Sequence, residues 1–157
     1  MLRGRIPIQN GVIERMIRKF DLHRKIHLYG CSSLKTPVTY GVIFPKIIWP
    51  LEFKEATRSD VRNMIAHELE HIRKLDVGKR YLLSITLCIH WFNPLMWLMY
   101  RLYLEDQEVA CDERVMRRMR EREAKSYVYT LIKMTSEERG TVVTLGFGGR
   151  NAARKRI

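Results

Sequence analysis

The pattern of apolar positions changes from helical to alternating within the first third of the chain. In residues 11–20 the apolar side chains recur every three or four positions, which predicts a short amphipathic helix with a basic outer face. Three later stretches alternate or are rich in β-branched and aromatic residues: 26–29, 37–44 and 46–49. They predict three short strands in a small sheet or meander, with Pro37 and Pro45 at strand starts or at an edge.

A second, longer helix is predicted directly after this sheet. Residues 57–60, Thr-Arg-Ser-Asp, offer side chains that cap a helix N-terminus. Apolar positions then recur at helical spacing from Val61 to Ile72, and we expect the helix to end near Leu75. The sequence therefore predicts an α+β fold: a small three-stranded sheet with an N-terminal helix, followed by a mostly helical half.

Residues 81–100 contain no Asp, Glu, Lys or Arg, and such a run is long enough to suggest a membrane span. The pair Asn93 and Pro94 argues against one continuous helix, because Asn caps helix N-termini and Pro suits the first helical position. We therefore expect one helix that ends near His90 and another that begins at Pro94. Their apolar side chains form either the buried core of two helices, which we expect, or a membrane-embedded or interfacial segment.

The helix that begins at Pro94 carries two carboxylates on an otherwise apolar stripe. It is expected to run towards Arg120, with Glu108 and Asp112 four residues apart on it. Burying these carboxylates is costly unless they are paired or bound to a metal. Either one binds a metal while the other orients a ligand, or both form ordinary ion pairs with arginines.

The last quarter of the chain is strongly basic. Five arginines interleaved with glutamates in residues 114–122 predict a solvated helix face, and a docking surface for a partner or lipid is the second interpretation. Residues 126–134 predict a last packed helix. The Gly-rich residues 141–149 predict an extended segment or loop.

Length and composition are typical of one folded domain. The chain has 157 residues with a hydrophobic fraction of 46%, which suits a folded protein rather than a disordered one. We expect a single domain over residues 1–157 with its core in 10–125, and residues 140–157 as a linker or tail of a truncated chain. Lys and Arg total 29 against 17 acidic residues. The net charge of +12 fits a nucleic acid, an anionic membrane or an acidic partner without choosing between them.

The cysteines and the N-terminus bear on the compartment. Cys31, Cys88 and Cys111 are scattered and form no Cys-x-x-Cys motif, so we expect a reducing compartment and no disulfide framework. The first seven residues are charged but have no apolar core or small-residue cleavage site. They are therefore not expected to be a signal peptide.

The strongest chemical signal is His67-Glu68-x-x-His71 within the second predicted helix. Residues four apart on a helix lie one above the other, so both imidazoles project from one face and can reach one zinc ion. Glu68 lies near enough to take a proton from a water molecule on the metal. Such short motifs recur by chance, and a helix face with solvated His and Glu is the alternative. The position of the motif on a capped helix after a small sheet favours the zinc site.

Three segments together carry a more specific pattern. They are His67-Glu-Leu-Glu-His71, His90-Trp-Phe-Asn-Pro-Leu-x-Trp97 and Glu108-Val-Ala-Cys-Asp-Glu113, with Pro and Gly positions between residues 37 and 50 in support. This combination resembles the metallopeptidase domain of BlaR/MecR-type antirepressor proteins. The resemblance covers most of residues 10–125, and residues 151–157 resemble the linker that follows the catalytic domain in that family.

The resemblance implies a membrane-integrated zinc endopeptidase of the gluzincin type, with its catalytic part at the cytoplasmic face of the membrane. The third zinc ligand of such proteins, a glutamate on a later helix, maps onto Glu108, and an aspartate that supports a zinc-binding histidine maps onto Asp112. One Zn²⁺ is thus expected on His67, His71 and Glu108, with Glu68 as the general base. The implied substrate is a protein or peptide, such as a transcriptional repressor or the chain itself. Direct contact with nucleic acid is not expected.

Two parts of the site are less sharply indicated. Candidate donors to the oxyanion of the substrate are His90, Arg101 and Tyr103. An extended substrate is expected to add to an exposed edge of the small sheet. The residues of that edge are Thr36, Pro37, Val38, Thr39, Tyr40 and Gly41.

Two alternatives to an active peptidase remain open from the sequence. The net charge and residues 114–122 would suit a non-catalytic module that binds DNA or a membrane, in which the histidine motif is incidental. The other alternative is a latent, zymogen-like form of the same zinc fold, in which a terminal segment occupies the cleft.

Overall fold

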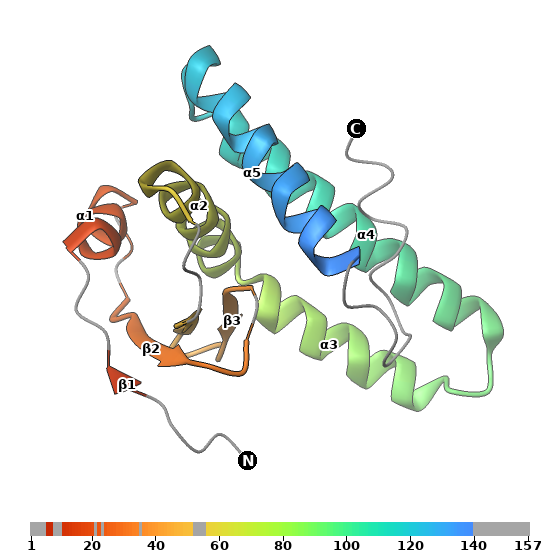
Figure 1. Ribbon diagram of the computed structural model, residues 1–157. Helices are drawn as coiled ribbons and strands as arrows, with labels where there is room; N and C mark the ends of the chain where they lie inside the picture. The colour runs from red at the N-terminus through yellow and green to blue at the C-terminus, as the bar shows by residue number, and fades with distance from the viewer. Residues whose placement is uncertain are drawn as a thin grey trace.

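The computed structural model describes residues 6–7, 11–20, 22, 24–34, 36–51 and 56–139. The described residues form a small sheet covered by helices, together with a helical hairpin that extends away from the sheet (Figure 1). The α+β fold expected from the sequence is confirmed. The loop expected at residues 141–149 and the tail expected at 140–157 lie outside the described residues.

The sheet contains the three strands that the alternating pattern predicts. Its strands are β1 (Ile6–Pro7), β2 (His27–Cys31), β3 (Val38–Tyr40) and β4 (Lys46–Pro50), in the order β1-β2-β4-β3. Strand β2 is parallel to β4, and β3 is antiparallel to β4. The arrangement is therefore not a meander, because β3 lies outside β4 instead of between β2 and β4. The two-residue β1, which the pattern did not indicate, pairs with the other side of β2.

Strand β3 is an edge strand that begins after Pro37, and Pro45 directly precedes β4, so both prolines lie at strand starts as predicted. A glycine turn connects β3 to β4. Gly41 follows β3 with φ of 89°, where a side chain is strained. A Cβ atom at this position would lie 2.6 Å from the carbonyl oxygen of Phe44. The turn therefore requires glycine.

Helices α1 (Gly11–Lys19) and α2 (Arg58–Lys74) enclose the main core with the sheet. Ile47 of β4 and Ile65 and Leu69 of α2 are fully buried in this cluster. Burying each such side chain contributes about 1.5–3 kcal/mol, which fixes the rotation of α2 about its axis. His67 follows Ile65 by two residues, or about 200° of helical rotation, so the histidines face away from this core.

The ends of α2 match the predicted caps and bring its last turn close to the next helix. Thr57 accepts a hydrogen bond from the backbone N–H of Asp60 (3.2 Å), and Asp60 accepts one from the N–H of Thr57 (3.0 Å). Such a capping box is typically worth about 1 kcal/mol or more. Leu75 ends the helix in the left-handed conformation, with φ of 57°. The chain turns there, so α3 (Asp76–Ile89) begins beside His71.

Helices α3 and α4 (Pro94–Met116) form the hairpin at the Asn93-Pro94 boundary that the sequence predicted. The side chain of Asn93 accepts a hydrogen bond from the N–H of Leu95 (2.9 Å), and Pro94 is the first helical residue. Helix α4 ends at Met116, several residues before the expected Arg120. Helix α5 (Glu121–Arg139) follows, longer than the predicted 126–134, and packs beside α2.

One prediction about packing is only partly right, and another is wrong. The basic residues 114–122 are largely exposed, as a solvated face requires, but they cross the turn between α4 and α5, and Arg114 reaches the fully buried Glu70 (3.3 Å). Residues 81–100 are not a buried core. Only Leu87 among them is buried, because α3 and α4 contact each other along a single face. Among helices in the described part of the chain, none combines the length and apolarity needed to cross a membrane.

Candidate metal centre

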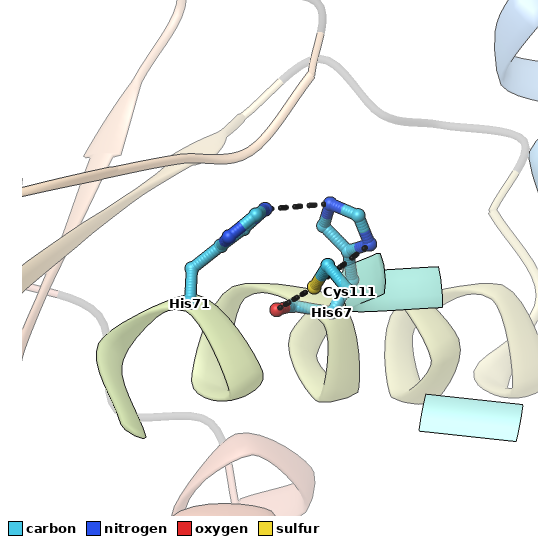
Figure 2. A group of neighbouring side chains, drawn as sticks. All are labelled: His67, His71 and Cys111. Atoms are coloured by element: carbon cyan, nitrogen blue, oxygen red, sulfur yellow. Dashed lines mark hydrogen bonds between the residues drawn. The ribbon is translucent and has the colours of Figure 1, made fainter. Parts of the chain in front are cut away.

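The Nε2 atoms of the two histidines of α2 point at each other. The Nε2 atoms of His67 and His71 lie 3.1 Å apart, and the two rings are nearly perpendicular, with their centroids 4.6 Å apart (Figure 2). The i, i+4 spacing places both rings on one face, and the burial of Ile65 and Leu69 turns this face towards α4. The pairing predicted from the motif is thus present in the structure.

Glu108 of α4 completes a three-sided arrangement around these nitrogens. Its carboxylate oxygens lie 3.5 Å from Nε2 of His67 and 3.7 Å from Nε2 of His71. A tetrahedral ion with bonds of about 2.1 Å separates its ligand atoms by about 3.4 Å. The observed separations of 3.1, 3.5 and 3.7 Å bracket this value, so these residues fit one zinc ion.

The far nitrogens of both rings are held by carboxylates. Nδ1 of His67 lies 3.0 Å from an oxygen of Asp112, and Nδ1 of His71 lies 2.9 Å from an oxygen of Asp76. Tyr127 of α5 donates to Asp112 (2.7 Å) and lies 3.0 Å from Nδ1 of His67. A carboxylate accepts the Nδ1 proton, so the neutral form of each ring presents the lone pair of Nε2. Two lone pairs that face each other call for a cation between them.

The electrostatics of the centre also favour a cation. Burial alone lowers the pKa of His71, but hydrogen bonds with Asp76, Cys111 and Glu108 outweigh it and raise this pKa to about 11. Burial also lowers the pKa of His67, but hydrogen bonds with Asp112, Cys111 and Glu108 outweigh this effect and raise the pKa well above its usual value. Burial raises the pKa of Glu108, yet the two imidazoles hold it far below its usual range. A divalent ion would supply the positive charge that protons otherwise provide.

Cys111 is a second possible donor next to the histidines. It is fully buried on α4, and its Sγ lies 3.8 Å from Nδ1 and 3.6 Å from the carbonyl oxygen of His67 (Figure 2). By distance, His67, His71 and Cys111 form a group that could hold an ion. The thiol, however, contacts the Nδ1 edge of His67, which Asp112 also holds. We therefore favour Glu108, which approaches the two Nε2 atoms, as the third ligand.

Glu68 lies beside the centre and next to the sheet edge. Its carboxylate accepts a hydrogen bond from the hydroxyl of Thr39 (2.5 Å), which is in the edge strand β3. Both residues, together with the two histidines and Glu108, line a cavity of about 310 Å³. The proposed base therefore faces the same space as the Nε2 atoms.

Among the residues expected to form the substrate edge, four line this cavity: Thr36, Pro37, Val38 and Thr39. Tyr40 and Gly41 do not line it. The expected oxyanion donors lie elsewhere: His90 caps α3 and contacts the carbonyl of Thr86, Arg101 pairs with Glu105, and neither they nor Tyr103 lines the cavity.

Sequence reasoning missed four residues of this centre: Asp76, Arg80, Cys111 and Tyr127. Arg80 of α3 lines the cavity and donates to Glu108 (2.5 Å), so Glu108 meets an arginine as well as the histidines. Asp76 could have been found from the sequence, because it is an acidic residue five positions after His71 and just past the predicted end of the helix. Tyr127 lies on α5, and no local pattern connects it with the motif.

The geometry has a counterpart among known proteins. The model of the family described as BlaR1 peptidase M56 matches residues 5–157. The chain belongs to the BlaR1 peptidase M56 family. This membership confirms the resemblance drawn from the three motif segments. The family is described as a peptidase family.

Curated relatives of this M56 domain are much longer proteins. It is 28% identical over 135 residues to the regulatory protein BlaR1 of Bacillus licheniformis. These residues make up 86% of this chain and 22% of that protein. It is 25% identical over 117 residues to the methicillin resistance mecR1 protein of Staphylococcus aureus (strain Mu50 / ATCC 700699), covering 73% of this chain and 20% of that protein. The chain thus spans about a fifth of the length of these relatives.

Proposed function

We propose that this M56 domain is a zinc-dependent endopeptidase that hydrolyses a peptide bond with Glu68 as general base. The observation that carries the proposal is the arrangement of three donors from two helices: two Nε2 atoms 3.1 Å apart, with the Glu108 carboxylate within 3.7 Å of both. Three protein ligands leave one position for water or substrate, as in catalytic zinc sites. Asp112 and Asp76 orient the two imidazoles through Nδ1.

Zinc in this position would act as a Lewis acid and lower the pKa of a water molecule towards neutrality. Glu68 takes the proton of that water and later passes it to the leaving amine. The hydrogen bond from Thr39 fixes the carboxylate of Glu68 at the edge of the cavity. The rotamer of the base is thus held before the substrate arrives.

Arg80 and Tyr127 are the best-placed donors for the developing oxyanion, because both line the cavity. Arg80 brings a fixed positive charge next to Glu108 (2.5 Å), and its side chain is 39% exposed, so it can reach an incoming carbonyl. Tyr127 is nearly fully buried and is engaged with Asp112. We therefore assign the oxyanion contact to Arg80 in place of His90, Arg101 or Tyr103.

An extended peptide would bind along β3. Strand β3 is the last strand of the sheet and has β4 on one side. Among the described residues no strand lies on its other side, so the backbone groups there face no other strand. Thr39 of β3 contacts the base directly, which places a peptide on this edge within reach of Glu68. Strand addition recognises the peptide backbone and leaves side-chain selectivity to the cavity.

The relatives suggest the biological setting. Their printed names describe a regulatory protein and a methicillin resistance protein. We propose that the domain works in a membrane-associated signalling protein at the cytoplasmic face. Its substrate there would be a protein such as a transcriptional repressor, or the chain itself.

The nucleic-acid alternative rests on the net charge of +12. Two basic side chains of residues 114–122 are engaged within the fold, since Arg114 and Arg118 pair with the buried Glu70, whereas the pair of Arg117 with Glu113 is exposed. The contacts with Glu70 favour a structural role for Arg114 and Arg118. Strongly salt-dependent DNA binding by the zinc-free protein would revive the alternative.

Zinc content tests the ligand assignment. Elemental analysis should find one zinc per chain in the wild type and none in Glu108→Ala. The matched control is Asp106→Ala, which removes an exposed acid two residues earlier on the same helix and should leave the zinc content unchanged. Equal zinc in Glu108→Ala and the control, together with loss in Cys111→Ser, would assign the third ligand to the thiol.

A further inference from the structure

The free end of the α3–α4 hairpin carries an unusually apolar exposed surface. Ten large side chains of residues 81–99 are more than half exposed, among them Leu82 68%, Ile89 64%, Trp91 69%, Phe92 70%, Leu95 59% and Trp97 52%. They lie on both helices and on the turn between them, so the exposed apolar area surrounds the end of the hairpin. Exposed patches of this kind mark an interaction site.

The free end of the hairpin is uncharged, and its charged residues lie at the opposite end, next to the rest of the fold. Residues 81–100 contain no charged side chain, whereas Lys79 precedes them and Arg101 follows them. Lys79 pairs with Asp76 and Arg101 with Glu105, and both cationic side chains are about half exposed, at 49% and 53%. Charged groups that frame an uncharged aromatic end, on a chain with a net charge of +12, are the arrangement expected at the surface of an anionic membrane.

Several polar side chains of the hairpin form hydrogen bonds within it. The hydroxyls of Ser84 and Thr86 donate to carbonyls one turn earlier (2.8 and 3.1 Å). The indole N–H of Trp97 donates to the carbonyl of Trp91 (2.8 Å), and Asn93 caps α4. A segment that enters hydrocarbon must satisfy its polar groups internally, whereas a protein partner would be expected to meet some of them.

The length of the hairpin limits how deep it can reach. The neutral part of α3, residues 81–89, is about 14 Å long at 1.5 Å per residue. The hydrocarbon core of a bilayer is about 30 Å thick, so this length matches a single leaflet. Figure 1 shows the turn of the hairpin at the end farthest from the sheet, with the base of α3 next to α2.

We propose that the end of the α3–α4 hairpin inserts into one leaflet of an anionic membrane and holds the cavity at the lipid surface. Arg80, at the boundary of the neutral segment, also lines the cavity. Insertion to this residue places the candidate metal centre within a turn or two of the headgroups. The peptides presented to it are then segments that lie close to the membrane. Insertion depends on none of the zinc chemistry, and it names the element by which the domain itself would meet the lipid.

The native cysteines provide a probe for this proposal. Cys88 lies on the hairpin and is exposed, whereas Cys31 and Cys111 are buried. A polarity-sensitive fluorophore on Cys88 of the folded full chain would report its surroundings in vesicles of phosphatidylcholine with about 30% phosphatidylglycerol. Insertion predicts a blue shift of the emission, and quenching by lipids that carry a quencher in the acyl chain.

A matched pair of variants separates insertion from other binding. Replacing both Trp91 and Phe92 by Ser should weaken vesicle binding by about tenfold or more, because each ring loses a favourable transfer into lipid. Tyr129→Ser, which removes an aromatic ring 76% exposed on α5, should bind like the wild type. Glu68→Gln should also bind like the wild type, so a failure of the zinc proposal stays distinguishable.

Three results would overturn the proposal. The first is vesicle binding that vanishes in high salt without any shift of the Cys88 probe, which indicates surface charge alone. The second is equal binding by the Trp91/Phe92 variant and the wild type. The third is a probe shift that depends on protein concentration in the absence of lipid, which indicates that a second copy of the chain covers the hairpin.

Discussion

Replacing Asp76 by Asn tests whether a buried carboxylate outside the ligand set orients His71. Asp76 is 1% exposed, and its oxygen lies 2.9 Å from Nδ1 of His71. The amide is nearly isosteric but loses the charge that holds the Nδ1 proton. Removal of such a partner from a metal ligand typically weakens metal affinity 10–100-fold, or by about 1.4–2.7 kcal/mol. We expect a loss of Zn²⁺ affinity in this range.

The fold also loses stability in Asp76→Asn, so the effect on zinc needs a control. Asp76 pairs with Lys79 (3.0 Å) and Arg114 (3.6 Å), and removing it should lower the free energy of unfolding by about 1–3 kcal/mol. Glu70→Gln is the matched variant: Glu70 is fully buried on α2 and pairs with Arg73 (2.8 Å) and Arg114 (3.3 Å), and in the described part of the chain it pairs with neither imidazole. It should destabilise the zinc-free fold to a similar extent while zinc affinity stays within about threefold.

Competition titration with a zinc chelator would give both affinities, and urea unfolding of the zinc-free proteins would give both stabilities. Added zinc should stabilise Asp76→Asn by about 1.4–2.7 kcal/mol less than it stabilises the wild type, because stabilisation by a ligand follows its affinity. Equal zinc affinity in Asp76→Asn and the wild type, or equal losses in Asp76→Asn and Glu70→Gln, would refute the orienting role.

Three further predictions concern the proton, the base and the turn. The raised pKa of His71, about 11 without metal, means that its proton stabilises the metal-free fold below pH 6.5 and that this stabilisation disappears as the pH rises through 11. Zinc must displace that proton, so zinc affinity should rise with pH and calorimetry in two buffers should detect proton release; a pH-independent affinity between 6 and 9 would contradict this. Thr39→Val should lower kcat about tenfold with zinc still bound, because Glu68 loses its hydrogen bond, and an unchanged kcat would show that the contact is dispensable. Gly41→Ala should lower the free energy of unfolding in urea by about 1–3 kcal/mol, whereas Gly11→Ala, with open space around it, should not; equal midpoints would refute the strain argument.

Local signals in the sequence predicted the elements that carry the site. The capping residues at Thr57 and Asp60, the period of apolar positions in α2 and the Asn93-Pro94 boundary depend only on neighbours along the chain, and all three are confirmed. The pairing of His67 with His71 follows from helix geometry alone. Such features are accessible from sequence because no distant residue decides them.

The remainder depends on how distant segments meet. The parallel pairing of β2 with β4 is decided by tertiary packing, since the alternating pattern also suits a meander. Asp76 reaches His71 only because Leu75 adopts a left-handed conformation, and Tyr127 arrives from α5. The exposure of residues 81–100 was mispredicted because an uncharged run indicates apolar surroundings without saying whether protein or lipid provides them.

Peptide cleavage by zinc-loaded protein, compared between the wild type and Glu68→Gln, tests the central claim most directly. The measurement would combine elemental analysis with mass spectrometry of a peptide library after incubation. We expect one zinc per chain in both proteins, cleavage by the wild type, and a rate at least about 100-fold lower in Glu68→Gln. Equal cleavage by both proteins, or a zinc-loaded wild type that leaves the library uncut, would contradict the assignment of this domain as an active zinc peptidase with Glu68 as its base.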